Sequence, residues 1–494
     1  MTRFNNKTNT NVTTNHEGAK AYKVGAELEL YSLVVTSMFS DKFYESADGR
    51  LERLRNLITQ VDPMFVAKLA VYAREQMYLR TIPLILVVEL ARVHNGDDIV
   101  RMTLARIVQR ADEITETLAY YQLANGRSGT KKLGKISNQI RKGLSDAFGK
   151  FDEYQFAKYN RDGDIKLRDA LFIVHPKPIS EEKQALFDKI VEGTLETPYT
   201  WETELSAKGN TAEVWTELIN SGRLPYMATL RNLRNMLDAG LETSVLNKVA
   251  SRIGNKDEVA KSRQLPFRFL SAYRELTGNA NPHTSTILNA LEDAITASVV
   301  NLKGFDYDTI LAIACDVSGS MRTSISERSK IENYDIGLVL GMLLQSKCKS
   351  VTSGMFGDTY KTINLPQHSI LQNVTELYRR AGEVGYSTNG YKVLDGLRAS
   401  KVKADKVMMF TDCQMWDSTW GGDQHIHKSW EKYKEFHPSA KLYLFDLSGY
   451  GTTPVSLHSG DVYLIAGWSD KVFDVMEAYD NGSSAIEQIE KIVI

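Results

Sequence analysis

The chain has 494 residues, of which 43% are hydrophobic and 24% are charged, and its formal net charge is −1. This length and composition are typical of an ordinary soluble protein with about two to four domains, each able to bury a core. A net charge near zero excludes a global field that would draw the molecule to nucleic acid or membrane, so any basic function must be local.

Residues 1–15 are polar and contain no apolar core, so we expect no signal peptide. The longest apolar run, residues 82–93, is too short to span a bilayer and contains Glu89. Three cysteines give no disulfide framework, and Cys315 and Cys413 lie in apolar runs that predict buried positions. Together these features predict a cytoplasmic protein without a membrane anchor.

Residues 17–300 have a helical pattern almost throughout. Apolar residues recur at intervals of three and four, for example along residues 100–118, and Asp62-Pro63 is a favourable helix start. Helices of about 10 to 16 residues with short connections predict helix pairs stacked as in a solenoid. We therefore expect a helical domain over residues 1–300.

Residues 126–178 carry a local excess of positive charge, with twelve Lys and Arg against six Asp and Glu. The glycine-rich stretch 126–135 contains Lys131, Lys132 and Lys135, and Arg141 follows it. Free backbone amides in such a loop suit phosphate groups, and lysines that displace counterions add affinity for a polyanion. The spacing is not that of a P-loop, and a loop whose charges face only water is the alternative.

Further along the chain, cations alternate with aromatic residues. His175 ends a predicted helix, where it could contact a base or simply cap the helix. The other candidate contacts in these segments are Arg231, Arg234, Arg263 and Arg268. Guanidinium groups and aromatic rings suit single-stranded RNA, because its unstacked bases expose both faces and edges.

From residue 305 onward, short apolar strands alternate with helices. The predicted strands are 309–315, 350–356, 406–411, 441–446 and 462–466, and the predicted helices between them include 331–345 and 391–400. This alternation predicts a doubly wound, mostly parallel sheet over residues 305–494, which makes the fold class α + α/β. Ligands of such folds bind at the carboxyl ends of the strands.

Oxygen-bearing side chains follow two of these strands. One strand ends in Asp316-x-Ser318-x-Ser320, Asp412 ends another, and Thr388 lies in a loop between them. Hard divalent cations prefer oxygen ligands, so the sequence predicts a site for Mg²⁺, with Ca²⁺ or Mn²⁺ as alternatives. Asp316 could instead only cap the next helix. A haloacid-dehalogenase phosphatase is disfavoured because it needs a second Asp where Ser318 stands.

These three segments resemble the metal-ion-dependent adhesion site of von Willebrand factor A domains, although Tyr386-Ser387 replaces the usual Gly-Gly before the threonine. Ahead of them come the basic loop and the motifs LRDALFIVHPKP (167–178), LPYMATLRNLRNM (224–236) and SRQLPFRFLSAY (262–273). In this order the motifs resemble the TROVE family over nearly the whole chain. The resemblance implies a ring of HEAT-like helical repeats closed by the A domain.

The resemblance also implies an RNA-binding role. In the family, single-stranded 3′ ends of RNA enter a central hole, and small noncoding Y RNA binds the outer basic surface. Lys158, Arg161 and His175 match the family's basic RNA-contact segment, and Lys131, Lys132 and Lys135 match the family's basic loop less precisely, because loop lengths vary. Asp316, Ser318, Ser320, Thr388 and Asp412 match its ion ligands.

We therefore expect a non-catalytic, monomeric ribonucleoprotein core that Y RNA can tether to a 3′ exoribonuclease such as polynucleotide phosphorylase. One alternative is a protein-interaction module, in which a carboxylate of an acidic partner completes the metal shell and the helical half is a scaffold. A subunit associated with a chelatase or an AAA protein is a further alternative, but no nucleotide-binding loop is present and the basic helical half would have no role.

Overall fold

A computed structural model describes residues 12–37, 45–126, 136–160, 163–298, 308–326, 329–419, 425–457, 460–469 and 471–494. Backbone packing groups the chain into two compact units. The sheet unit comprises residues 1–52 and 247–485, and the helical unit comprises residues 53–246 and 486–494. The expected domain boundaries at 1–300 and 305–494 stay a prediction.

Three helices carry the chain from one unit to the other: α2 (Ala47–Ile58), α15 (Thr243–Ile253) and α24 (Ala485–Glu490). The helical unit contains α3 (Pro63–Glu75), α4 (Thr81–Val93), α5 (Ile99–Ile107), α6 (Asp112–Ala124), α7 (Asn138–Phe148), α8 (Glu153–Tyr159), α9 (Leu167–Val174), α10 (Glu181–Glu192), α11 (Trp201–Lys208), α12 (Ala212–Asn220), α13 (Tyr226–Arg231) and α14 (Leu233–Asp238).

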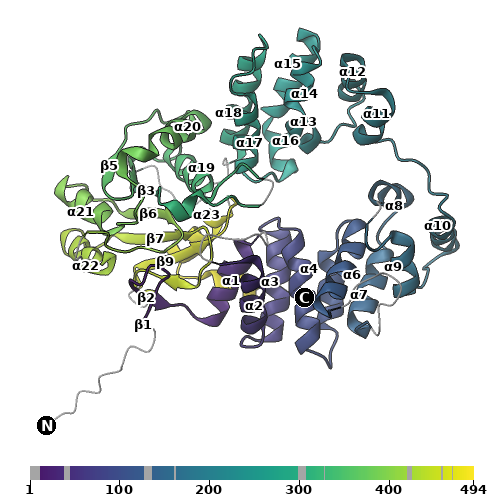
Figure 1. Ribbon diagram of the computed structural model, residues 1–494, viewed down its shortest axis with the longest axis horizontal. Coiled ribbons are helices and arrows are strands. Elements are labelled where there is room, and N and C mark those ends of the chain that lie inside the picture. Colours follow the sequence, from purple (N-terminus) through teal and green to yellow (C-terminus); the bar gives the residue numbers. More distant parts are fainter. Residues whose placement is uncertain are drawn as a thin grey trace. The chain divides into compact units, whose positions relative to one another are not determined.

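The first helices of the helical unit pack as pairs, as the apolar spacing predicts: α3 lies against α4 (Figure 1), and α5 packs against α7. Asp62 accepts a hydrogen bond from the amide of Met64 at 2.7 Å, which confirms the predicted start of α3. The approach of α5 to α7 requires a glycine, because a Cβ at Gly143 would lie 2.9 Å from the carbonyl oxygen of Arg101.

The apolar residues that recur along residues 100–118 do not belong to one helix, although their spacing continues without a break in the sequence. Helix α5 ends at Ile107 and α6 begins at Asp112. The Glu113 carboxylate accepts hydrogen bonds from the amides of Gln109 at 2.8 Å and Arg110 at 3.1 Å. These bonds satisfy backbone donors that the break exposes, so a polar side chain overrides the apolar period.

Before the first helix, the chain forms a small sheet that the helical pattern from residue 17 did not predict. The strands β1 (Val12–Thr14), β2 (Lys20–Lys23) and β8 (Thr452–Thr453) pair antiparallel in the order β1-β2-β8. Tyr22 lies opposite Thr453. The expectation of helix from residue 17 is therefore wrong for residues 20–23, and α1 (Ala26–Val35) begins only afterwards.

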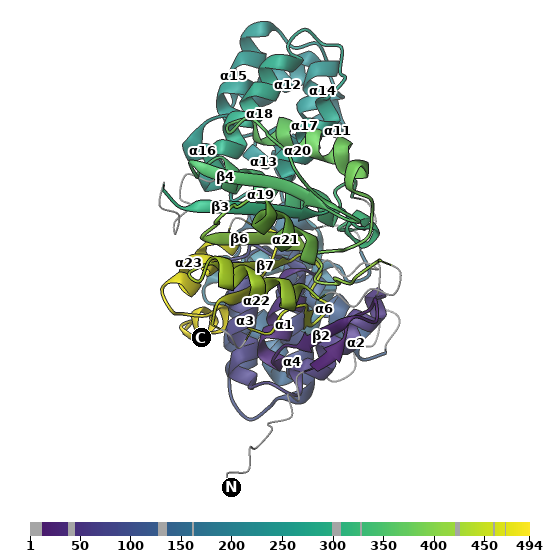
Figure 2. The ribbon, with the colours of Figure 1, turned by 90° about the vertical axis from the view of Figure 1, so that its left-hand side faces the viewer.

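The large sheet has the order β5-β4-β3-β6-β7-β9, and Figure 2 shows β4, β3, β6 and β7 side by side. Its strands are β3 (Ile310–Asp316), β4 (Ser350–Phe356), β5 (Tyr360–Thr362), β6 (Lys406–Thr411), β7 (Lys441–Asp446) and β9 (Val462–Ala466). All neighbours pair in parallel except β5, an antiparallel edge strand that was not predicted. The predicted combination of a helical half with a mostly parallel sheet is confirmed.

Helices cover both faces of this sheet, as continuous apolar strands require. They are α19 (Asn333–Gln345), α20 (Ile370–Arg380), α21 (Tyr391–Ala399), α22 (Ile426–Phe436) and α23 (Val472–Asp480). Ala312, Met409 and Leu444 face one core with α21 and α22. Ile313 faces the opposite side, where a Cβ at Gly341 of α19 would lie 3.1 Å from it. The alternation along β3 therefore buries both of its faces.

The sheet unit also contains α16 (Lys256–Ser262), α17 (Phe267–Leu276) and α18 (Thr284–Ser298). Arg274 of α17 forms a paired hydrogen-bonded ion pair with Asp335 of α19, with distances of 2.7 and 2.5 Å. Glu292 of α18 accepts amide hydrogen bonds from Leu371 and Gln372 at the start of α20. Charged groups therefore fix α17 and α18 to the α/β layer, and α16 packs against α18. Within the described ranges, no helix is both long and apolar enough to cross a lipid bilayer.

Candidate functional site

The carboxyl end of β3 places the first candidate metal ligand in the centre of the sheet. Asp316 is fully buried, between the ends of β4 and β6. Its Oδ1 accepts the amide of Ser318 at 2.9 Å, and its Oδ2 accepts the hydroxyl of Thr411 at 2.7 Å. Strand pairing and these two bonds fix the orientation of the carboxylate before any ligand arrives.

Two buried hydroxyls follow on the same loop. The chain turns through the short 3₁₀ helix η2 (Gly319–Arg322), and the side-chain oxygens of Ser318 and Ser320 lie 3.2 Å apart. Both serines are nearly inaccessible to solvent. The predicted Asp-x-Ser-x-Ser segment therefore gathers three oxygen-bearing side chains at one strand end.

The threonine loop joins this cluster through backbone hydrogen bonds. The amide of Gly319 donates to the carbonyl of Tyr386 at 3.2 Å, and the amide of Trp416 donates to the carbonyl of Thr388 at 3.2 Å. Thr388 is buried, whereas the Tyr386 ring is 56% exposed. The Tyr386-Ser387 pair therefore occupies the usual Gly-Gly place without blocking the approach of the loop.

A glycine makes that approach possible. A Cβ at Gly357, directly after β4, would lie 2.2 Å from the carbonyl oxygen of Gly385. The carbonyl of Gly357 also accepts the amide of Asn389 at 3.1 Å. Any side chain at position 357 would push the threonine loop away from the end of β3.

Asp412 supplies the second buried carboxylate at the end of β6. Its Oδ1 accepts the amide of Gln414 at 3.1 Å, while its Oδ2 is buried and has no partner in hydrogen-bonding geometry among the described residues. Burial raises the pKa of Asp412, and the charge of Asp316 raises it further, although the nearby Ser320 hydroxyl lowers it in part. Burial also raises the pKa of Asp316.

Two buried carboxylates with raised pKa values and an unpartnered oxygen indicate a site arranged for positive charge. Across the described ranges, no group of three or more His, Cys, Asp or Glu side chains could hold a metal ion. Hydroxyl oxygens would therefore have to complete the ligand set. Of the five predicted residues, Asp316 and Asp412 supply carboxylates, and Ser318, Ser320 and Thr388 supply hydroxyls. This oxygen-only set suits a hard divalent cation.

One nearby carboxylate was not predicted. Asp446 ends β7, the next strand of the sheet, and its Oδ1 accepts the amides of Ser448 at 3.0 Å and Gly449 at 2.7 Å. Its charge contributes to the raised pKa of Asp412. The signal was present, because Asp446 follows a buried apolar strand in the same way as Asp316 does.

The predicted RNA contacts fall on helices and helix ends. Lys131, Lys132, Lys135 and Arg161 lie outside the described residues. The seven that the structure describes are all at least partly exposed to solvent: Arg141 on α7, Lys158 on α8, His175 after α9, Arg231 on α13, Arg234 on α14, Arg263 after α16 and Arg268 on α17.

Backbone conformation explains two of these positions. His175 and Arg263 each end a helix in the left-handed region, with φ values of 51° and 50°. A residue in the left-handed conformation ends a helix, so both residues lie at helix ends, where their side chains are exposed. The guanidinium of Arg268 lies 5.2 Å from the ring centre of Phe267; the ring is buried, so only the guanidinium is accessible to a ligand.

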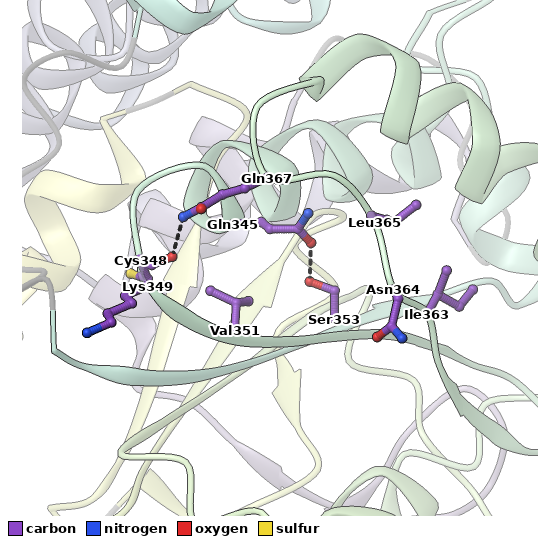
Figure 3. Close-up of a pocket in the computed structure, with 9 residues that line it drawn as sticks. All are labelled: Gln345, Cys348, Lys349, Val351, Ser353, Ile363, Asn364, Leu365 and Gln367. Carbon is purple, nitrogen blue, oxygen red and sulfur yellow. Dashed lines mark hydrogen bonds between the residues drawn. The ribbon is translucent and has the colours of Figure 1, made fainter.

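A polar cavity of about 170 Å³ lies against β4 in the sheet unit, and Figure 3 shows its lining. The amide of Gln367 donates to the carbonyl of Cys348 at 2.7 Å, and Ser353 donates to Gln345. Gln345 in turn donates to the carbonyl of Pro366 at 3.2 Å. These bonds connect α19, β4 and the loop before α20, so the cavity has a structural role.

Comparisons with known proteins agree with this architecture. A family model described as TROVE domain matches residues 32–195 and 192–300, and one described as Ro60 vWA domain matches residues 310–480. The crystal structure of the Deinococcus radiodurans Ro (RSR) protein is similar in fold, with a TM-score of 0.61 and 18% sequence identity. That comparison covers 93% of this chain and 100% of the other.

Two curated relatives are named telomerase protein component 1. The rat protein is 28% identical over 333 residues, which is 51% of this chain and 13% of the rat protein. The mouse protein is 28% identical over 295 residues, which is 44% of this chain and 11% of the mouse protein. The match therefore spans only about an eighth of the length of these relatives.

Proposed function

We propose that this chain, which belongs to the TROVE-domain family and is an RNA-binding Ro-like protein, is the core of a ribonucleoprotein with a small noncoding RNA of the Y RNA type. In this proposal it takes single-stranded 3′ ends of misfolded or structured RNAs for quality control, maturation or decay, and it catalyses no reaction itself. A ring closed by the A domain, with a central opening for the strand, is part of the proposal.

The exposure of the predicted contacts carries this proposal. None of the seven described residues is buried, and they fall on segments that the family match covers. Because the formal net charge is −1, such local groups have to supply the attraction to phosphate. A cytoplasmic location, a monomeric protein and recruitment of a 3′ exoribonuclease such as polynucleotide phosphorylase belong to the same proposal.

Salt dependence tests the RNA interface. We expect the logarithm of the association constant for a single-stranded RNA to fall linearly with the logarithm of salt concentration, with a slope of about −0.7 per neutralised phosphate. Reversing both Arg231 and Arg234 to Glu should make the slope shallower by about 1.4, because two phosphate contacts are lost. Fluorescence anisotropy of a labelled oligonucleotide measures both slopes.

The control variant replaces Lys428 and Lys432 with Glu. Both are exposed lysines on α22, where no RNA contact is expected. This variant should keep the wild-type slope. Wild-type binding that stays constant between low and moderate salt would contradict a phosphate-dominated interface.

We also propose that Asp316, Ser318, Ser320, Thr388 and Asp412 hold a divalent cation, Mg²⁺ or alternatively Ca²⁺ or Mn²⁺. The unpartnered buried Oδ2 of Asp412 supports this proposal, because a buried carboxylate oxygen without a donor is costly unless a cation compensates it. A bound cation would supply a position for an acidic group of a ligand. The five residues would hold the cation in place.

The same site favours a second candidate function, an interaction module that binds an acidic partner through the cation. Asp316→Ala and the charge reversals Lys158→Glu and Arg231→Glu separate the two functions. If the protein works through RNA, we expect the reversals to weaken RNA retention and Asp316→Ala to leave it largely intact. Crosslinking and sequencing of the RNA retained in cells measures this, with circular dichroism as the folding control. Loss of all ligands in Asp316→Ala alone would instead favour the interaction module.

A further inference from the structure

A cavity of about 440 Å³ lies in the helical unit, between α8 and the pair α11 and α12. Ligand pockets usually have volumes of this order, roughly 300–1,000 Å³. Three aromatic rings, two cations and one apolar side chain are the main components of its wall: Tyr154, Tyr199, Trp201, Lys158, Arg223 and Leu218. Among these, only Lys158 was expected to contact RNA.

A capping box fixes two of the rings. The hydroxyl of Thr200 accepts the amide of Thr203 at 3.1 Å, and the hydroxyl of Thr203 accepts the amide of Thr200 at 3.0 Å. Thr203 also donates to the carbonyl of Pro198 at 3.0 Å. These bonds hold the turn that carries Tyr199 and Trp201 in one conformation, so both rings are positioned before a ligand binds.

A carboxylate brings this turn to α8. Glu153 accepts hydrogen bonds from the side chain of Lys189 at 2.7 Å and from the amide of Glu196 at 3.2 Å. These two donors lower the pKa of Glu153, which keeps its carboxylate charged. Glu153 is the neighbour of Tyr154 in α8, so the bond to Glu196 draws the segment before Tyr199 toward the Tyr154 side of the cavity.

Each wall of the cavity carries a cation over an aromatic ring. The guanidinium of Arg223 lies 5.4 Å from the ring centre of Tyr199. The ammonium of Lys158 lies 5.8 Å from the ring centre of Tyr154 and 5.5 Å from that of Tyr159. Tyr154 is 47% exposed, so a large part of this side chain is accessible to a ligand.

We infer that this cavity binds one unpaired nucleobase of a single-stranded RNA, with the adjoining phosphate between Lys158 and Arg223. Every base has a π-face that can stack on tyrosine or tryptophan, so the cavity would accept different sequences. Two cations at its wall disfavour a quaternary ammonium ligand, which aromatic cages otherwise bind. The inference rests on the proposed RNA-binding function and adds a base-stacking site to it.

The test compares two single strands of equal length, one an oligoadenylate and the other an abasic strand with the same phosphates. Their affinities for the full-length protein are measured by fluorescence anisotropy at fixed salt. We expect Trp201→Leu to reduce the preference for the base-bearing strand about tenfold, because stacking on one ring contributes on the order of 1–3 kcal/mol per base. The affinity of the Trp201→Leu variant for the abasic strand should stay unchanged. Tyr199→Leu should act in the same direction, and it replaces Trp201→Leu if that variant fails to fold.

Phe172→Leu is the matched control. Phe172 is an exposed ring on α9 with Arg168 at 5.9 Å from its centre, so it has the same chemistry outside the cavity. This variant should keep the wild-type preference. Lys158→Gln should weaken the affinity for both strands by the same factor, because it removes only a phosphate contact. The ratio of the two affinities should therefore stay unchanged.

Several results would overturn the inference. An unchanged preference for the base-bearing strand in both Trp201→Leu and Tyr199→Leu would do so. An equal loss of affinity for both strands in these variants would also do so. Displacement of the oligoadenylate by polyglutamate, combined with indifference to the bases, would assign the cavity to an acidic peptide instead. If wild-type protein bound neither strand, the proposed RNA-binding function would fail as well, which is a distinguishable outcome.

Discussion

Glu113→Ala should lower the free energy of unfolding of the helical unit by about 3–5 kcal/mol, the cost of leaving a buried charge without its partner. The Glu113 side chain is fully buried and pairs with Arg74 at 2.7 Å. Its other oxygen satisfies the amides of Gln109 and Arg110 between α5 and α6. Burial raises the pKa of Glu113 and lowers that of Arg74, so each charge depends on the other. Urea denaturation, with the transitions of the two units fitted separately, measures the change.

Glu116→Ala is the matched control on the same helix. The Glu116 side chain is 40% exposed and pairs with Arg80 near the surface. Exposed ion pairs contribute roughly 0–1 kcal/mol, so this variant should be only slightly less stable than wild type. Equal effects of the two substitutions would show that the break between α5 and α6 does not depend on the buried pair.

Asp412→Asn should stabilise the metal-free protein and remove most of the stabilisation that Mg²⁺ gives to wild type. In metal-free protein the substitution removes a buried carboxylate whose Oδ2 has no hydrogen-bond partner among the described residues and which lies near the charges of Asp316 and Asp446. We therefore expect a gain of about 1–3 kcal/mol. With Mg²⁺ at a hundred times its dissociation constant, wild type should gain about 2.7 kcal/mol, and the variant should gain little. Thermal unfolding with EDTA and with MgCl₂ measures both differences.

Asp446→Asn separates a metal ligand from a structural carboxylate. Asp446 is also buried, but it accepts two backbone amides and is not among the predicted ligands. Its substitution should destabilise the metal-free protein and leave the gain from Mg²⁺ intact. A gain from Mg²⁺ that survives in Asp412→Asn and disappears in Asp446→Asn would mean that the ligand set is wrong.

The candidate metal site was accessible from the sequence because one geometric rule governs it. Parallel strands end at the same edge of a sheet, so Asp316 and Asp412, each after a buried strand, had to lie near each other. The same rule applied to Asp446 would have added the third carboxylate. Neither the orientation of the Thr388 loop nor the close approach of Gly357 to Gly385 leaves a pattern in the sequence.

Other features were not predictable because their signals are short or distant. Strands β1, β2 and β8 have too few residues to show an alternation, and β2 pairs with a segment more than 400 residues away. The break after Ile107 depends on one carboxylate. Tyr154, Tyr199 and Trp201 come together through the bonds of Glu153 and Thr203, not through any spacing along the chain.

The pairing of Tyr22 with Thr453 has a consequence for synthesis in the cell. Translation adds on the order of 5–20 residues per second, so strand β2 leaves the ribosome roughly 20–90 s before its partner exists. During that interval the unpaired backbone hydrogen-bonding groups of β2 can pair with strands of other chains. We expect nascent chains to need protection by a chaperone until the second half of the sheet unit has been made.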